Sequence, residues 1–177
     1  MQGPKHESGP EGYGYSSADV PHPMEGVEMS WITDQTLFLM WSALPNKDPD
    51  RLDQEMGNVL LMLMESEATR VILDNYDNAC AAASYRRSDL EGVGYDWGIL
   101  QGVVAIPEIG DGPPADALKT LAVRSIEEAA RSYGIRGLLV DAPSAEEQAF
   151  YRNVGYALAK EGHSAFYKYL LPTRGDH

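Results

Sequence analysis

The sequence predicts a single α/β domain in which a mixed central sheet is flanked by helices. The chain has 177 residues, 44% of them hydrophobic, which is enough for one well-packed core. Short apolar runs of strand length are followed by longer segments whose apolar residues recur at helical spacing. Capping and breaking residues stand at the ends of those segments and mark the order of the elements.

Residues 1–25 differ from the rest of the chain. They are rich in Gly, Pro, Ser, Tyr and His and show no hydrophobic periodicity, so we expect an extended or disordered N-terminal arm. Tyr13 and Tyr15, together with the prolines, suit an arm laid across a protein partner or a second copy. An ordinary unstructured terminus is the alternative. The folded domain is then expected over residues 26–177.

The domain is expected to open with a strand over residues 27–33, where apolar and polar residues alternate. Asp34 is a plausible N-cap for a short helix over residues 35–43. A stronger helix follows over residues 51–65. Its core-facing stripe recurs at helical spacing and comprises Leu52, Met56, Val59, Leu60 and Leu63.

The middle of the chain predicts a hairpin, a third strand and a long helix. Strands over residues 70–73 and 79–86 flank a turn of Asp and Asn residues, and Cys80 lies in a small-residue run typical of a buried strand. The next strand runs from Trp97 to Ile106. A helix over residues 115–133 has one apolar face and ends at Gly134.

The last quarter alternates strand, helix and hairpin. A strand is expected over residues 137–141, and Ser144 with Glu147 forms a capping box for the helix that follows. That helix carries Tyr151 and ends at Gly155. A hairpin over residues 156–160 and 165–171 closes the domain.

This order of elements, over nearly everything after residue 26, resembles the GNAT superfamily of N-acetyltransferases. The run Phe150-Tyr151-Arg152-Asn153-Val154-Gly155-Tyr156 is similar to the ending of that family's fourth helix. The resemblance implies a mixed sheet in which two parallel strands, beginning near Trp97 and Gly137, separate at their C-terminal ends. Acetyl-CoA lies in that wedge in the family.

The resemblance also implies a loop that binds the cofactor's pyrophosphate, because backbone N–H groups at a helix start attract phosphate. Ile106, Gly110, Gly112 and Ala115 are the candidate cofactor-binding residues, with Lys119 or Arg124 as a charge partner. The loop departs from the family's pattern: Pro113 and Pro114 have no N–H, and Asp111 and Asp116 add negative charge. A structural loop with proline in the first helical turn is the alternative.

For catalysis, the resemblance implies that Tyr151 protonates the departing thiolate. A tyrosine packed between helix and sheet is the alternative. The strand from Trp97 contains no acid in its interior, so the candidate general base is Glu108 at its end or Asp96 just before it. As exposed loop carboxylates they would have no such role.

Charge and composition narrow the partners. The formal net charge is −13, which disfavours nucleic acid and anionic membranes and favours a cationic amine as substrate. A lone cysteine allows neither an intramolecular disulfide nor a thiolate metal cluster, and no metal-ligand spacing stands out. There is no apolar run of membrane-spanning length and no secretory pattern, so we expect a cytoplasmic protein.

Two functions therefore compete. In the first, the protein transfers an acyl group from acetyl-CoA to a small-molecule or peptide amine. In the second, the fold serves as a non-catalytic interaction module or as a structural subunit of a larger assembly, for example a virion component.

Overall fold

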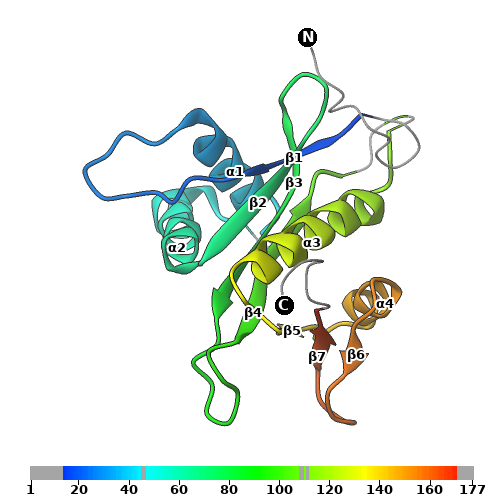
Figure 1. Cartoon of the computed structure of the whole chain (residues 1–177). Coiled ribbons are helices and arrows are strands. Elements are labelled where there is room, and N and C mark those ends of the chain that lie inside the picture. Colours follow the sequence, from blue (N-terminus) through cyan, green and yellow to red (C-terminus); the bar gives the residue numbers. More distant parts are fainter. Residues whose placement is uncertain (1–13, 45–46, 108–109, 111, 171–177) are drawn as a thin grey trace.

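The computed structural model describes residues 14–44, 47–107, 110 and 112–170, and these form one sheet with helices on both faces (Figure 1). The elements are β1 (Ser16–Asp19), α1 (Trp31–Ser42), the 3₁₀ turn η2 (Pro49–Arg51), α2 (Leu52–Glu65), β2 (Ala68–Leu73), β3 (Ala79–Arg87), β4 (Trp97–Ala105), α3 (Ala115–Ser132), β5 (Gly137–Asp141), α4 (Ala145–Asn153), β6 (Ala157–Leu158) and β7 (Ala165–Tyr169).

The sheet is mixed, as predicted. Its order is β1-β2-β3-β4-β5-β7-β6, and among the described strands only the pair β4–β5 is parallel. Two core clusters divide at the sheet. One lies under α3 and α4 and contains Ile126, Phe150 and Phe166, while the other lies under α1 and α2 and contains Leu37 and Leu63. Within the described part of the chain, no helix is both long and apolar enough to span a bilayer.

The strand predicted over residues 27–33 is wrong. The alternation of apolar residues there is coincidental, because the hydroxyl of Ser30 accepts the N–H of Thr33 at 3.3 Å and caps α1, which begins at Trp31. The first strand is β1, inside the segment expected to be an arm.

β1 has no hydrophobic signal and is held by its pairing with β2 together with side-chain hydrogen bonds from that strand. It pairs antiparallel with β2, whose Arg70 donates to Asp19 Oδ1 at 2.6 Å and to Ser17 Oγ at 2.7 Å. Residues 1–13 lie outside the described residues, so the role of an arm in binding a partner stays a prediction.

The other helices and strands follow the sequence within a few residues. The Ser144–Glu147 capping box is confirmed: Glu147 N–H donates to Ser144 Oγ at 3.1 Å, and Ser144 Oγ donates to Glu147 Oε1 at 2.9 Å. Gly134 and Gly155 both have positive φ where helices end. These two capping patterns predict the boundaries well, whereas Asp34, the predicted N-cap of the first helix, is wrong: it lies in the first turn of α1, which Ser30 caps.

Strand β4 carries a bulge that the sequence does not reveal. Its register with β3 shifts between the pairs Ser84–Gln101 and Ala82–Val104, and Gly102 has φ 64°. Leu100 lies in the core under α3, whereas Val104 packs against the core under α1 and α2. The extra residue bends β4 just beyond the point where its pairing with β5 stops.

Candidate functional site

The two parallel strands separate after a short seam. Only Trp97–Gly137, Gly98–Leu138 and Ile99–Leu139 are paired, and β4 then continues to Ala105 along β3 alone. Residues 101–106 are all half-buried, although β4 is a central strand. Beyond Ile99 the edge of β4 that faces β5 has no strand partner, so its N–H and C=O groups are available to an extended ligand that carries amides.

A small cavity opens between this part of β4 and the helices. Its volume is about 60 Å³, and three elements line it: Val103 from β4, Asp116 and Lys119 from the start of α3, and Glu146, Glu147, Phe150 and Tyr151 from α4. Three carboxylates thus face one ammonium group. The cavity favours a cation over an anion at this point.

Tyr151, the predicted acid, is buried at this cavity. Its ring packs edge-on against Phe150 at 5.0 Å and against Tyr156 at 5.5 Å between centroids. Burial, and then the charge of Glu147, raise the pKa of the Tyr151 hydroxyl above its ordinary value. The hydroxyl is therefore protonated at neutral pH and can donate a hydrogen bond or a proton.

The ring of Tyr156, against which Tyr151 packs, is held by a buried ion pair between Glu127 and Lys168. Tyr156 donates to Glu127 Oε2 at 2.9 Å, and Lys168 Nζ lies 3.0 Å from Glu127 Oε1. Lys168 also donates to the carbonyl oxygen of Val154 at 3.0 Å, at the end of α4. The pair joins α3, α4 and β7. In the sequence, the one sign of this network is the acidic residue Glu127, which lies among the apolar residues that α3 buries.

The start of α3 offers few donors. Its N-cap is Pro114, which makes no side-chain cap, and the first hydrogen bonds run from the N–H groups of Ala117 and Leu118 to Pro114 O at 3.0 and 3.3 Å. The N–H groups of Ala115 and Asp116 precede those bonds and point out of the helix start. Lys119 lies one turn further along α3, half-buried at the cavity.

The structure brings some of the predicted site residues together and leaves others apart. Tyr151 and Lys119 line one cavity, and Ala115 begins the helix beside it. Ile106 packs against both core clusters. Gly110, with φ 55°, and Gly112 belong to the loop before α3, whereas Glu108 lies outside the described residues. The roles of these residues stay predictions.

Four lining residues were not found from the sequence as part of a site. Val103 reaches the cavity because of the bulge, while Glu146 and Phe150 reach it because α4 turns its first two turns toward β4. Glu147 was assigned to capping alone. Glu147 has two roles: one oxygen of its carboxylate accepts from Ser144 Oγ at the start of α4, and the same side chain lines the cavity.

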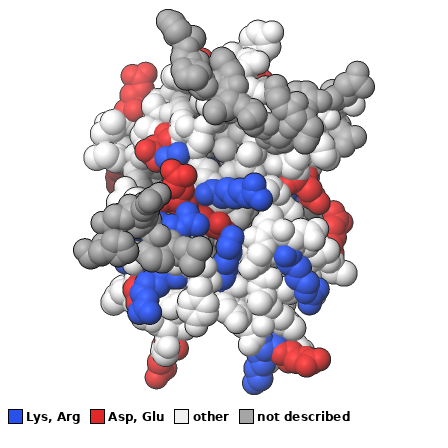
Figure 2. Space-filling view, turned by 45° about the vertical axis from the view of Figure 1, so that its right-hand side comes forward, with Lys and Arg blue, Asp and Glu red and all other residues white. Residues whose placement is uncertain are grey.

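The residues fit the acetyl-CoA implied by the resemblance in part. The open edge of β4 suits the amides of the pantetheine arm, while Pro113 and Pro114 remove two donors for the pyrophosphate. Lys and Arg side chains do cross the middle of the face that Figure 2 turns forward, where α3 and α4 lie in Figure 1. Asp and Glu side chains lie beside them on the same face, so the charges there are mixed.

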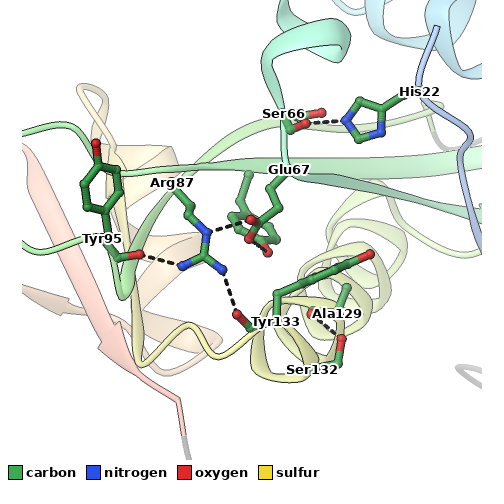
Figure 3. Close-up of polar contacts among 9 residues, drawn as sticks. His22, Ser66, Glu67, Arg87, Tyr95, Ala129, Ser132 and Tyr133 are labelled. Atoms are coloured by element: carbon green, nitrogen blue, oxygen red, sulfur yellow. Dashed lines mark hydrogen bonds and ion pairs between the residues drawn. The ribbon is translucent and has the colours of Figure 1, made fainter.

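The far end of α3 is fixed by Arg87, as Figure 3 shows. Its Nε lies 2.6 Å from Glu67 Oε2, and its two terminal nitrogens donate to Tyr95 O and Tyr133 O, both at 2.7 Å. Tyr85 donates to the other oxygen of Glu67. The contacts join β3, the β3–β4 loop and the end of α3, and so fix the direction in which α3 points at the wedge.

Solved structures share this arrangement at low sequence identity. A GNAT family N-acetyltransferase from Escherichia coli, crystallised with CoA, superposes with a TM-score of 0.61 at 12% identity, over 89% of this chain and 82% of that one. For a GNAT family acetyltransferase from Brucella melitensis in complex with acetyl-CoA the TM-score is 0.60 at 13% identity, over 90% of both chains.

An aminoglycoside 6′-acetyltransferase superposes with a TM-score of 0.61 at 14% identity, over 89% of this chain and 98% of that one. No protein-family model and no curated protein matches the sequence. The shared element order, the separated parallel strands and these superpositions agree. The chain therefore has the fold of the GNAT superfamily of N-acetyltransferases, as the order of its elements predicted.

Proposed function

We propose that the protein transfers an acyl group from acetyl-CoA to an amine. The observation that carries the proposal is the separation of β4 from β5 after Ile99, with the buried hydroxyl of Tyr151 at the opening. A sheet that leaves a central strand edge unpaired loses backbone hydrogen bonds, which a ligand lying along that edge restores.

Bound acetyl-CoA would supply an acyl thioester, whose carbonyl an amine attacks. The edge of β4 would hold the amides of the cofactor's arm, and the N–H groups of Ala115 and Asp116 with Lys119 would hold its phosphates. Tyr151 keeps its proton until the sulfur departs and then donates it. The carboxylates at the cavity attract a cationic amine, with Glu108 as the proposed base.

One observation favours a second candidate, a non-catalytic interaction module. The cavity is only about 60 Å³ and has three carboxylates against one lysine. Together with Pro113 and Pro114, this opposes a polyanionic cofactor. Binding of acetyl-CoA by the purified chain separates the two candidates.

The direct test is calorimetric titration with acetyl-CoA, together with thermal unfolding. A ligand at about 100 times its Kd stabilises the native state by about 2.7 kcal/mol, so a clear rise in Tm is expected. Turnover is then followed as free thiol released with a polyamine, an aminoglycoside or a lysine peptide as acceptor. Absence of any Tm shift at millimolar acetyl-CoA contradicts the proposal and favours the non-catalytic module.

Tyr151→Phe tests the proposed acid. The ring packing is kept while the proton is lost, so kcat is expected to fall about 100-fold and the affinity for acetyl-CoA to change less than twofold. Tyr95→Phe, at an exposed position, is the matched control and should leave kcat unchanged. Equal kcat in wild type and Tyr151→Phe would remove Tyr151 from the chemistry.

A further inference from the structure

A second groove lies away from the wedge, between the segment that leads into α1 and helix α2 (Figure 1). Its volume is about 260 Å³. We call it the methionine groove. Its walls are Met24, Val27 and Met29 from the segment and Leu60 and Met64 from α2, with Glu25 at the rim. Nothing in the proposed acyl transfer uses these residues.

The apolar side chains of the methionine groove are open to solvent. The exposed fractions are 63% for Met24, 59% for Val27 and 41% for Met64, and Leu61 beside them on α2 is 53% exposed. All six residues over 59–64 are apolar, yet only Val59 and Leu63 are buried. A helix that is apolar on its outer side as well as its inner side is typically covered by another element.

Both elements that form the groove carry acidic side chains. Glu25 and Glu28 are exposed on the segment, and α2 carries Asp53, Glu55 and Glu65. Neither α2 nor residues 21–30 contain a lysine or an arginine. Asp53 precedes Gly57, Leu60 and Met64 at helical spacing, so it continues the stripe that faces the groove. An occupant must therefore present apolar side chains flanked by positive charge.

We propose that the methionine groove binds an amphipathic helix of a partner protein, with Lys and Arg on either side of its apolar stripe. The groove is lined by side chains and offers no open sheet edge, which favours a helix over an added strand. Unbranched methionine side chains adapt to the shape of an incoming helix. A second copy of this chain is disfavoured, because a symmetric contact would bring two acidic surfaces of the same kind together.

The test uses the full chain and a fluorescein-labelled 18-residue peptide of Leu and Lys, with Leu at helical i, i+3, i+4 spacing. Binding is measured by fluorescence anisotropy at physiological salt. The double variant Met24→Ser, Met64→Ser should weaken binding at least about tenfold, because both side chains line the groove. Leu90→Ser, which removes an equally exposed leucine elsewhere, should change the Kd less than twofold.

Two further peptides test whether binding depends on charge and on the helical pattern, and one measurement tests whether the double variant is folded. A Leu/Glu peptide of the same pattern and a shuffled Leu/Lys peptide should both bind at least about tenfold more weakly. Circular dichroism of the double variant checks that its fold is kept. Equal binding by the double variant or by the shuffled peptide would overturn the proposal, as would a dimer in sedimentation velocity that the double variant abolishes.

Discussion

Gly102 determines the course of β4 at the level of a single residue. Its φ of 64° is in the left-handed region, and a Cβ there would lie 2.8 Å from Met62 Cε and 3.2 Å from Met40 Cε. The conformation shifts the strand's alternation, so that Val103 faces the cavity with Tyr151. The positive φ favours glycine here, and an added Cβ would also require the ends of the two methionine side chains to move.

Gly102→Ala should therefore destabilise the protein by about 2 kcal/mol or more, from backbone strain together with the clash. Gly162→Ala is the matched control, since Gly162 also has positive φ but open space around it. Its cost should be about 1 kcal/mol, from strain alone. Urea unfolding measures both. Equal costs would show that the methionine side chains move aside freely.

Arg87 joins three separate parts of the chain through one side chain. Arg87→Lys keeps the charge but loses the planar fork that reaches Glu67, Tyr95 and Tyr133 together. We expect a loss of about 2 kcal/mol in the free energy of unfolding. Arg86→Lys, which changes an exposed pair with Asp89, should lie within about 0.5 kcal/mol of wild type.

At the scale of elements, the start of α3 decides how an anion is received. The helix points free N–H groups toward the wedge, but Asp116 in its first turn adds a carboxylate to the cavity wall. A negative charge at this position stabilises the helix itself and opposes a phosphate. Helix stability and the proposed binding thus make opposite demands on this residue.

Asp116→Asn should tighten binding of acetyl-CoA about two- to fivefold at low salt, because one repulsive charge is removed. The gain should shrink as salt rises. Glu128→Gln changes an exposed acid on α3 outside the cavity and should leave the Kd unchanged. Titration calorimetry at two salt concentrations measures both variants, and an unchanged Kd for Asp116→Asn would place the phosphates elsewhere.

On the scale of the whole molecule, ionisable groups in the core make stability depend on alkaline pH. Burial, and then the charge of Asp74, raise the pKa of the Cys80 thiol to about 11. Burial is also the main cause that raises the pKa values of Tyr85, Tyr151 and Tyr156. All four groups are protonated in the native state at a pH where the unfolded chain has begun to lose protons.

The contribution of these four groups to folding stability should consequently be constant below about pH 8 and fall above it, because the unfolded state then binds fewer protons than the native state. Each group contributes a slope of about 1.4 kcal/mol per pH unit, and the thiol's share is complete near pH 11. Urea unfolding from pH 8 to 11 measures the slope. Cys80→Ala should reduce it, and a flat profile would contradict the burial of these groups.

The sequence was a good guide where elements carry their own end signals. The capping box at Ser144 and the glycines at 134 and 155 define α3 and α4, and the tyrosine signature points to Tyr151. It was a poor guide to β1, which is held by Arg70 from a strand about fifty residues later in the chain. It was also a poor guide to the bulge at Gly102, which depends on the register of β4 with β3. Neither depends on local pattern alone.

The same distinction holds for the candidate site. Lys119 and Tyr151 were found because each belongs to a local motif, whereas Val103 and Glu146 come from β4 and α4 and meet them at one cavity only in the folded chain. The pair Glu127–Lys168 spans elements far apart in the chain. Such contacts depend on where the helices are placed in three dimensions, which periodicity does not specify.

The short seam between β4 and β5 has a mechanical consequence. Three residue pairs between β4 and β5 join the four strands β1–β4 to the three strands β5, β7 and β6. The sheet therefore resists shear only weakly between β4 and β5. The load passes instead through α3 and α4, whose apolar faces bridge both parts in one cluster. The two halves can therefore twist against each other with few hydrogen bonds broken, and the width of the gap follows the helices rather than the strands.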